Sequence, residues 1–404
     1  MSDSDTAAGA GSRPRLPPEI WVLVSASFVI ALGYGIVAPV LPQFARSFGV
    51  GVTAASAVIS AFALMRLLFA PAAGRLVQRS GERPVYLLGL LIVAFSTGAC
   101  AFANGYWQLL VFRGLGGIGS TMFTVSALGL LIRISPPENR GRVSGLYATS
   151  FLMGTIGGPV LGSALIGFGL GLRAPFAIYA VALLIAAAVV FFRLRHSHLA
   201  SPETGGAVRV MTLRDGLVQP AYRAALTSNF ANGWSVFGVR MAIIPLFVVE
   251  ALDSSAAVAG IALTVFAVGN ALVLLPAGRL SDRWGRKPFI VTGAVVAGAC
   301  TMVLGFSESL PVFFASVLVA GMGSGLINPA QQAAVADIVG SRARGGPVLA
   351  AFQMAADVGT VLGPVGAGLL AQHYSYGVAF VVTGAVLFVA AAYWVLVPDT
   401  LERR

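Results

Sequence analysis

Long apolar segments recur along the whole chain, and clusters of Gly, Pro and Arg separate them. A membrane-spanning helix needs about 20 consecutive, mostly apolar residues. Segments of this length predict six helices in the first half, over residues 20–45, 53–75, 84–103, 106–132, 144–167 and 173–192. They predict six more in the second half, over residues 222–249, 256–279, 287–306, 311–335, 347–371 and 374–396. The pattern therefore predicts an all-α membrane protein with 12 transmembrane helices.

The composition supports this fold class and changes what the net charge can mean. Of the 404 residues, 57% are hydrophobic and 10% are charged, whereas roughly a quarter of the residues in a soluble globular protein carry charge. This difference excludes water-soluble enzymes and nucleic-acid-binding proteins. A net charge of +11 would suggest an acidic partner for a soluble chain. In a membrane protein, the distribution of the basic residues between the loops indicates orientation instead.

The basic residues predict the orientation of the chain in the membrane. If the N-terminus lies inside, the predicted inside segments hold 21 of the 26 Lys and Arg residues, and the outside loops hold two. Such an asymmetry is the positive-inside signal. We therefore expect a multi-pass protein of the cytoplasmic (inner) membrane with both termini in the cytoplasm.

A polar stretch over residues 194–221 separates two halves that resemble each other. Residues 74–84 recur 204 residues later as 278–288, and residues 154–162 recur near 359–366. Matching segments at nearly one offset indicate an internal repeat. Two parallel six-helix repeats would enclose a site near the membrane midplane, and rocking would expose it to either side. The predicted units are an N-terminal six-helix bundle, a cytoplasmic linker and a C-terminal six-helix bundle, over residues 1–193, 194–221 and 222–404.

These segments resemble motifs of the major facilitator superfamily. Residues 278–288 (GRLSDRWGRKP) are similar to its G-x-L-a-D-R-x-G-R-K-P signature, and residues 74–84 resemble a degenerate copy. Residues 113–119 (RGLGGIG) resemble its R-x-x-Q-G-x-G motif, with Gly116 where Gln is usual. Residues 154–162 resemble the glycine-proline motif of the antiporter branch, and PVLP at 39–42 resembles its P-x-L-P. The resemblance implies the major facilitator fold of two pseudo-symmetric bundles, and a secondary transporter most similar to the 12-helix drug:proton antiporters.

The two signature copies predict a gate on the cytoplasmic face. Glycines permit the tight turn between helices, and fixed charges bond to helix ends and hold that face closed. The charges look swapped between the halves, with Glu82 and Arg133 in one and Arg286 and Asp337 in the other. We expect both pairs to form, the alternative being four solvated loop charges. The predicted gate residues are Gly74, Glu82, Arg83, Arg133, Gly278, Asp282, Arg283, Gly285, Arg286 and Asp337.

The glycine-proline segments predict close helix packing. Gly154, Gly158 and Gly162 recur every four residues, which presents a flat stripe to a neighbouring helix. Pro159, and Gly363 with Pro364 in the second half, complete the predicted packing residues.

Charges inside the predicted spans carry the sharpest functional signal, since each is costly in the bilayer. Four lie well inside, namely Arg66, Arg113, Arg240 and Asp357. Proton coupling needs a group that gains and loses a proton, which Asp357 can do and arginine cannot. We interpret Asp357 as the proton carrier; a permanent ion pair with an arginine, or a charge that binds substrate, are the alternatives. The family resemblance implies a coupling role for Arg113.

Polar stripes on three predicted helices indicate a substrate cavity. Asn229, Asn232 and Arg240 share one face, as do Gln353 and Asp357 on a second helix. The full set predicted to line the cavity is Tyr34, Arg66, Asn229, Asn232, Trp234, Arg240, Asn328, Gln331 and Gln353. Interhelical packing is the alternative for each of them. Because arginines outnumber acids in the spans, we expect an anionic, zwitterionic or neutral amphipathic solute in preference to a cation.

Together these features favour proton-coupled efflux of a small amphipathic organic solute or drug by alternating access. A proton symporter that imports a sugar or organic anion, and a lipid flippase, stay open on the same scaffold. An enzyme is disfavoured, because the loops lack gathered acid, base or nucleophilic groups. The expected partners are the solute, protons and the bilayer, with no nucleic acid, no cofactor and no metal, and we expect a monomer. Cys100 and Cys300 both fall in apolar runs and are expected to fill the core.

Overall fold

A computed structural model of the chain describes residues 16–134, 140–194, 211–339 and 346–401. The first half forms seven helices, α1 (Pro18–Val37), α2 (Leu41–Arg46), α3 (Val52–Ser80), α4 (Glu82–Ala101), α5 (Tyr106–Ile134), α6 (Arg140–Gly167) and α7 (Ala174–Arg193). The second half forms α8 (Leu213–Val218), α9 (Pro220–Asn232), the π-helix η2 (Gly233–Val239), α10 (Arg240–Glu250), α11 (Ala256–Trp284), α12 (Arg286–Leu304), α13 (Leu310–Val339), α14 (Gly346–His373) and α15 (Tyr376–Leu396). Within these described residues, 12 helical segments are long and apolar enough to cross a membrane, as the sequence predicts.

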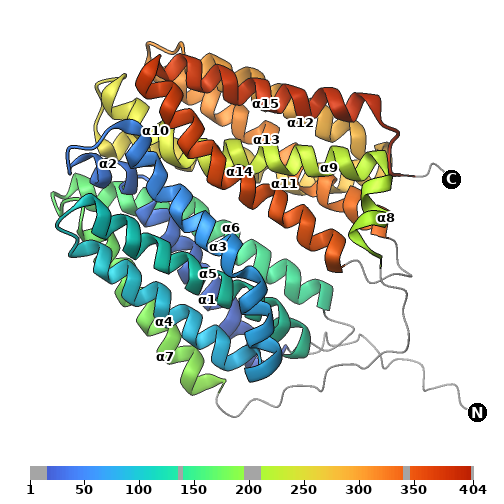
Figure 1. The fold of residues 1–404 in the computed structure, drawn as a ribbon, viewed down its shortest axis with the longest axis horizontal. Helices are drawn as coiled ribbons and strands as arrows, with labels where there is room; N and C mark the ends of the chain where they lie inside the picture. The colour runs from blue at the N-terminus through green and yellow to red at the C-terminus, as the bar shows by residue number, and fades with distance from the viewer. Residues whose placement is uncertain (1–15, 135–139, 195–210, 340–345, 402–404) are drawn as a thin grey trace, which may run out of the picture.

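The long helices form two bundles, α1–α7 and α9–α15, which lie side by side (Figure 1). Helix α1 begins and helix α15 ends at the same end of the molecule, which we call the terminal end. The opposite end, which carries α2 and the end of α10, is called the distal end. The bundles approach each other at the distal end and diverge toward the terminal end (Figure 1).

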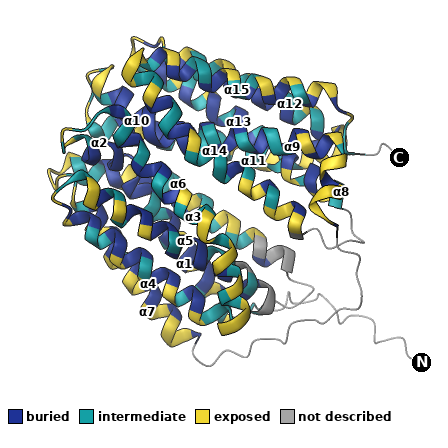
Figure 2. Ribbon diagram, viewed as in Figure 1, coloured by how far each residue is buried: buried dark blue, intermediate teal, exposed yellow. Residues whose placement is uncertain are grey.

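Large apolar side chains cover the outer faces of both bundles. Figure 2 shows exposed residues along the outward sides of the helices. The exposed apolar side chains of the molecule include Leu68, Phe95, Phe192 and Leu275, which are each at least 60% exposed. Apolar surface on this scale is unfavourable in water and favourable in lipid. The exposed faces therefore fit a chain embedded in a bilayer.

Three local features differ from the sequence prediction. The predicted helix over residues 20–45 is divided into α1 and α2, because Pro39 and Pro42 cannot donate the backbone hydrogen bonds of a continuous helix. The predicted span 222–249 consists of α9, η2 and α10 in succession. The predicted linker loop contains the short helix α8, in which Thr212 and Asp215 form a capping box.

The glycine stripe of α6 packs against α1 at backbone distance. A Cβ atom at Gly154 would lie 2.7 Å from the carbonyl oxygen of Phe28, and one at Gly158 would overlap that of Leu32. In the second half, Gly363 of α14 lies against the backbone of Trp234, and Pro364 lies against Gly238. A side chain at these glycines would push the helices apart, so the small residues set the interhelical distance.

Candidate functional site

A cavity of about 660 Å³ lies between the two bundles. Helices α1 and α6 line it from the first bundle, and α9, η2, α10, α11, α13 and α14 line it from the second. Its lining reaches Val335 and Leu349, which lie near the terminal end. The volume falls in the range of sites for drug-sized molecules. Seven of the predicted cavity residues line it, namely Tyr34, Asn229, Asn232, Arg240, Asn328, Gln331 and Gln353.

The two walls of the cavity differ in polarity. The first bundle contributes Tyr34, Gly35, Ala148, Phe151, Leu152, Thr155 and Pro159, which are mostly apolar. The second bundle contributes Arg240 and seven side-chain amides, Asn229, Asn232, Asn270, Asn328, Gln331, Gln332 and Gln353, beside ten apolar residues. Arg240 is the only charged residue among the described residues of the lining, and no carboxylate is present there. The cavity thus suits an amphipathic molecule whose polar end faces the second bundle.

Most of the amides are held by one another. The Nε2 atom of Gln331 donates to Oδ1 of Asn229 at 3.0 Å, and Nδ2 of Asn232 donates to Oδ1 of Asn328 at 3.1 Å. Asn229 is fixed further by donating to the carbonyl oxygen of Phe352 at 2.6 Å. The Oδ1 atom of Asn232 is buried and has no hydrogen-bond partner. A buried acceptor without a partner is costly, so a ligand donor that reached this atom would relieve the cost.

The π-helix η2 determines where Arg240 points. A π turn inserts about one extra residue into the helix and rotates the residues after it, and Arg240 is the first residue beyond the turn. Its Nε atom donates to the carbonyl oxygen of Val236 at 3.0 Å, and the guanidinium lies 4.3 Å from the ring centre of Phe266. These contacts fix the root of the side chain, and Arg240 belongs to the cavity lining.

Trp234 and Arg66 do not line the cavity, contrary to the sequence prediction. The indole Nε1 atom of Trp234 donates to Oγ1 of Thr383 at 3.3 Å, and its ring lies against Gly366. Trp234 therefore packs against α14 and α15. Arg66 lies on α3, and its Nε atom is buried without a hydrogen-bond partner. Periodicity alone could not distinguish these positions, because the π turn and the neighbouring helix decide which way they face.

Asp357 also lies outside the cavity lining, although its neighbours Gln353 and Ala356 belong to the lining. Gln353 and Asp357 thus share a face, but only Gln353 belongs to the cavity lining. Helix α14 packs against α3 here, and the half-buried Asp357 carboxyl interacts with Gln353 through a hydrogen bond and with the charge of Arg66. No ion pair within 4.0 Å joins Asp357 to Arg66 in the described chain. The carboxyl thus lies at the seam between the bundles and reaches the cavity through Gln353.

Arg113 is buried inside the first bundle. Its guanidinium lies 4.2 Å from the ring centre of Phe62 and 5.9 Å from that of Tyr34, and its Nε atom has no hydrogen-bond partner. Since Tyr34 lines the cavity, Arg113 is one residue removed from it.

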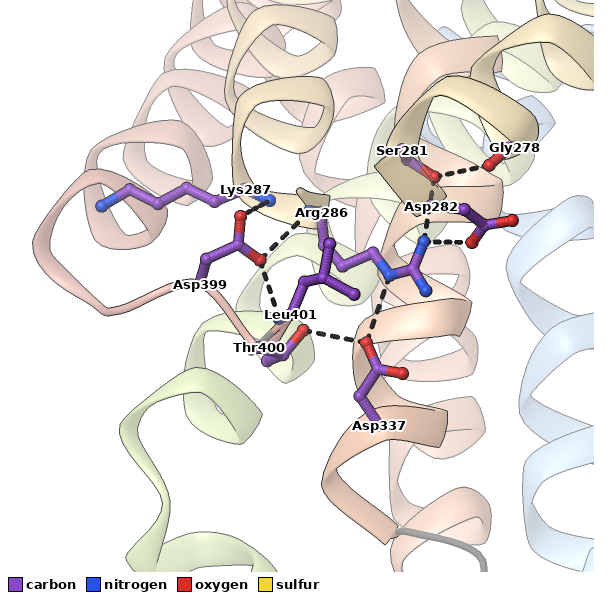
Figure 3. Close-up of polar contacts among 9 residues, drawn as sticks. All are labelled: Gly278, Ser281, Asp282, Arg286, Lys287, Asp337, Asp399, Thr400 and Leu401. Atoms are coloured by element: carbon purple, nitrogen blue, oxygen red, sulfur yellow. Dashed lines mark hydrogen bonds and ion pairs between the residues drawn. The ribbon is translucent and has the colours of Figure 1, made fainter. Parts of the chain in front are cut away.

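A cluster of charges surrounds the start of α12 at the terminal end (Figure 3). Arg286 forms ion pairs with Asp282 and with Asp337, the latter at 3.1 Å between Nε and Oδ2. Asp399, beyond the end of α15, accepts the backbone N–H groups of Arg286 and Lys287 at 3.1 and 3.3 Å. The Arg286–Asp337 contact expected from the sequence is present, and every member of the cluster belongs to the second bundle. The cluster is present although the two bundles diverge at this end, so the cluster does not by itself hold the bundles together.

The equivalent pair in the first bundle is described only in part. The side chain of Arg133 lies outside the described residues. Glu82 lies against Gly129 of α5, where an added Cβ would be 2.7 Å from Cγ of Glu82. The predicted pair of Glu82 with Arg133 therefore stays a prediction.

An ion pair that the sequence analysis missed joins the bundles at the distal end. The Nε atom of Arg46 lies 2.7 Å from Oε1 of Glu250, and the hydroxyl of Tyr376 donates to Oε2 of Glu250 at 2.6 Å. Arg46 and Glu250 are 204 residues apart, which is the offset of the internal repeat. Equivalent positions of the two halves thus carry opposite charges and meet between the bundles. Comparison of charges at this offset outside the spans would have revealed the pair.

The distal end is closed by further contacts between the bundles. The backbone N–H of Thr53 donates to Oε1 of Gln372 at 3.1 Å, and the hydroxyl of Ser60 donates to the carbonyl oxygen of Val361 at 2.6 Å. Both contacts join α3 to α14. The molecule is therefore closed at its distal end while the cavity lining extends toward the terminal end.

Comparisons with known proteins agree with this architecture. Residues 23–239 and 225–404 each match the family model described as Major Facilitator Superfamily. The chain is 26% identical to multidrug resistance protein 2 of Bacillus subtilis (strain 168), over 88% of this chain and 90% of that protein. It is 29% identical to the class E tetracycline resistance protein of Escherichia coli, over 79% of each.

Solved structures show the same fold at low sequence identity. A bacterial homologue of the human lysosomal transporter Spinster, in an inward-facing and unoccupied conformation, gives a TM-score of 0.80 at 18% identity and covers 96% of this chain and 97% of its own. A D-xylose-proton symporter gives a TM-score of 0.74 at 17% identity, over 94% and 98%. The repeat, the two bundles and the family match, which covers both halves, lead to one conclusion: the chain belongs to the major facilitator superfamily and is a membrane transporter, not an enzyme.

Proposed function

We propose that the chain is a proton-coupled exporter of a small amphipathic organic solute, working by alternating access in the cytoplasmic membrane with both termini inside. The observation that carries the proposal is the cavity between the bundles, which has one apolar and one amide-rich wall. The names of two relatives, a multidrug and a tetracycline resistance protein, support export. The cavity is built within one chain, so a monomer suffices.

Asp357 is the proposed proton carrier. A group at the seam between α3 and α14 changes its surroundings when the bundles rock, whereas a group inside one bundle does not. A carboxyl that loses contact with water favours its protonated form, and a nearby arginine favours the charged form. Movement of Arg66 relative to Asp357 would therefore couple proton binding to the position of the bundles. Arg113 would transmit the state of the cavity through Tyr34, which it neighbours.

The charge cluster at the start of α12 is proposed to serve the gate at the terminal end. It makes the ends of α11, α12 and α13 one rigid unit through Asp282, Arg286 and Asp337. A rigid rim closes and opens as a whole, which two-state alternation requires. The remaining predicted gate residues, in both copies of the signature, are proposed to serve the same gate.

The proposal is tested in vesicles that contain the purified chain under an imposed pH gradient. We expect substrate-dependent proton flux in which solute and protons move in opposite directions, with tetracycline, fluorescein and rhodamine 123 as the first probes. Movement of probe and protons in the same direction would replace the antiporter by a symporter. Scrambling of a fluorescent anionic lipid without proton flux would replace it by a flippase.

A further inference from the structure

We infer that the cavity binds an organic anion, whose carboxylate is held by Arg240 and whose far end donates a hydrogen bond to Asn232. This assignment rests on the proposed function only in taking the cavity as the transport site. It specifies one class of solute among the anionic, zwitterionic and neutral ones that the sequence leaves open.

The charge balance of the cavity favours an anion. Arg240 is the only charged residue of the described lining, and its guanidinium makes no ion pair within the described chain. A guanidinium without a counter-ion in a low-dielectric site is unfavourable, and a bound anion would relieve the cost. A cation would meet repulsion there and no carboxylate to bind it.

The geometry of the Arg240 guanidinium suits a carboxylate. Its Nε atom is occupied by the carbonyl oxygen of Val236, and the ring of Phe266 lies 4.3 Å from its central carbon. The two terminal nitrogens form the end of a planar fork that matches a carboxylate with two parallel hydrogen bonds. The aromatic ring and the backbone contact hold this fork in position before any ligand arrives.

The Asn232 amide suits a hydrogen-bond donor at the other end of the ligand. The Oδ1 atom of Asn232 is buried without a partner, while Nδ2 of the same amide is held by Asn328. The free position is therefore an acceptor, and it fits an O–H or N–H donor. Asn232 and Arg240 are eight residues apart, which is at most about 12 Å along a helix axis. The expected ligand is an elongated molecule with an acid at one end and a donor at the other.

The apolar wall accounts for the middle of the ligand. Phe151, Leu152 and Pro159 of the first bundle line the cavity opposite the amides. An aromatic or alicyclic body would bury its surface there and contribute about 25 cal/mol per Å² of apolar area. The three features together describe an amphipathic aromatic acid.

Binding of two dyes to the purified full chain in detergent tests the assignment by fluorescence anisotropy. Fluorescein and rhodamine 123 share a xanthene ring system, but the first carries a free carboxylate and is an anion, whereas the second is a cation whose carboxyl group is esterified. We expect the wild type to bind fluorescein more tightly. Arg240→Gln should weaken fluorescein binding by at least about tenfold, as expected for loss of a charge-assisted pair, without weakening rhodamine 123. Arg240→Lys keeps the charge and loses the fork, so it should show an intermediate affinity for fluorescein.

Arg223→Gln is the matched control, because Arg223 is exposed on α9 outside the cavity lining and its loss changes the net charge equally. It should bind fluorescein like the wild type. Tighter binding of rhodamine 123 by the wild type, or equal fluorescein affinity for Arg240→Gln and the wild type, would overturn the assignment. Displacement of fluorescein by short-chain phosphatidylglycerol but not by benzoate would assign the site to a phosphate and overturn the carboxylate. Binding is measured without a pH gradient, so a failure of proton-driven export would contradict the proposed function and leave the anion site intact. Export of a cation would contradict the anion site and leave the proposed exporter intact.

Discussion

The ion pair between Arg46 and Glu250 predicts how strongly the distal end is held closed. Their side chains are 36% and 29% exposed, and a pair of this exposure contributes about 0.2 to 1 kcal/mol. The hydrogen bond from Tyr376 to the Glu250 carboxylate lies within the second bundle, so it orients the carboxylate without joining the bundles. Glu250→Ala removes the ion pair, so it should cost the closed arrangement about 0.2 to 1 kcal/mol. The ratio of distal-closed to distal-open molecules should fall roughly 1.4- to 5-fold.

Spin-label distance measurements can detect this shift. Labels at Asn104 and Ser309, which are exposed in distal loops of the first and second bundle, should report a longer distance population in Glu250→Ala. The background would carry Cys100→Ala and Cys300→Ala, so that only the labels react.

Two variants distinguish the ion pair from a general effect of charge. Glu308→Ala removes an exposed carboxylate of a distal loop and should leave the distances unchanged. Arg46→Glu combined with Glu250→Arg should recover part of the closed population, because the positions are equivalent in the repeat. Unchanged distances in Glu250→Ala, or equal shifts in Glu250→Ala and Glu308→Ala, would refute a role of this pair in closing the distal end.

Three further sets of substitutions test the packing by thermal unfolding. Gly158→Ala should lower the melting temperature, because its Cβ would overlap a backbone carbonyl of α1, whereas Gly145→Ala on the same helix meets open space and should not. Asp399→Ala should destabilise the chain by about 1 kcal/mol, because the carboxylate caps the first N–H groups of α12; an unchanged melting temperature would remove the cap from the account. Trp234→Phe and Thr383→Val should each lower the melting temperature equally and leave dye affinity unchanged, since their hydrogen bond lies outside the cavity lining.

Much of the fold can be predicted from length and hydropathy, because each span must satisfy its own backbone hydrogen bonds in lipid. The 12 spans and the internal repeat are of this kind, and so is the contact between Arg286 and Asp337, since the repeat offset reveals it. The amide stripes are also readable, because Asn229 and Asn328 occupy faces that are polar on otherwise apolar helices. Each of these features can be predicted from the sequence of a single helix or from the 204-residue offset between the two halves of the repeat.

The positions that could not be predicted depend on the partner helix. Asp357 and Gln353 are one turn apart, yet only Gln353 reaches the cavity, because α3 packs against the face that carries Asp357. Trp234 lies inside the π-helix η2, whose altered periodicity a regular helical projection does not contain. Arg46 and Glu250 lie at helix ends outside the predicted spans, where a charge is not costly and so gives no functional signal.

The most direct test of the account is transport by Asp357→Asn in vesicles. We expect this variant to exchange solute across the membrane at equal pH but to lose accumulation driven by a pH gradient, because an amide carries no exchangeable charge. Asp253→Asn is the matched control, since Asp253 lies in an exposed loop with a positive φ of 49° that asparagine also adopts. Full gradient-driven accumulation by Asp357→Asn, with Asp253→Asn behaving like the wild type, would contradict proton coupling through the carboxyl at the seam.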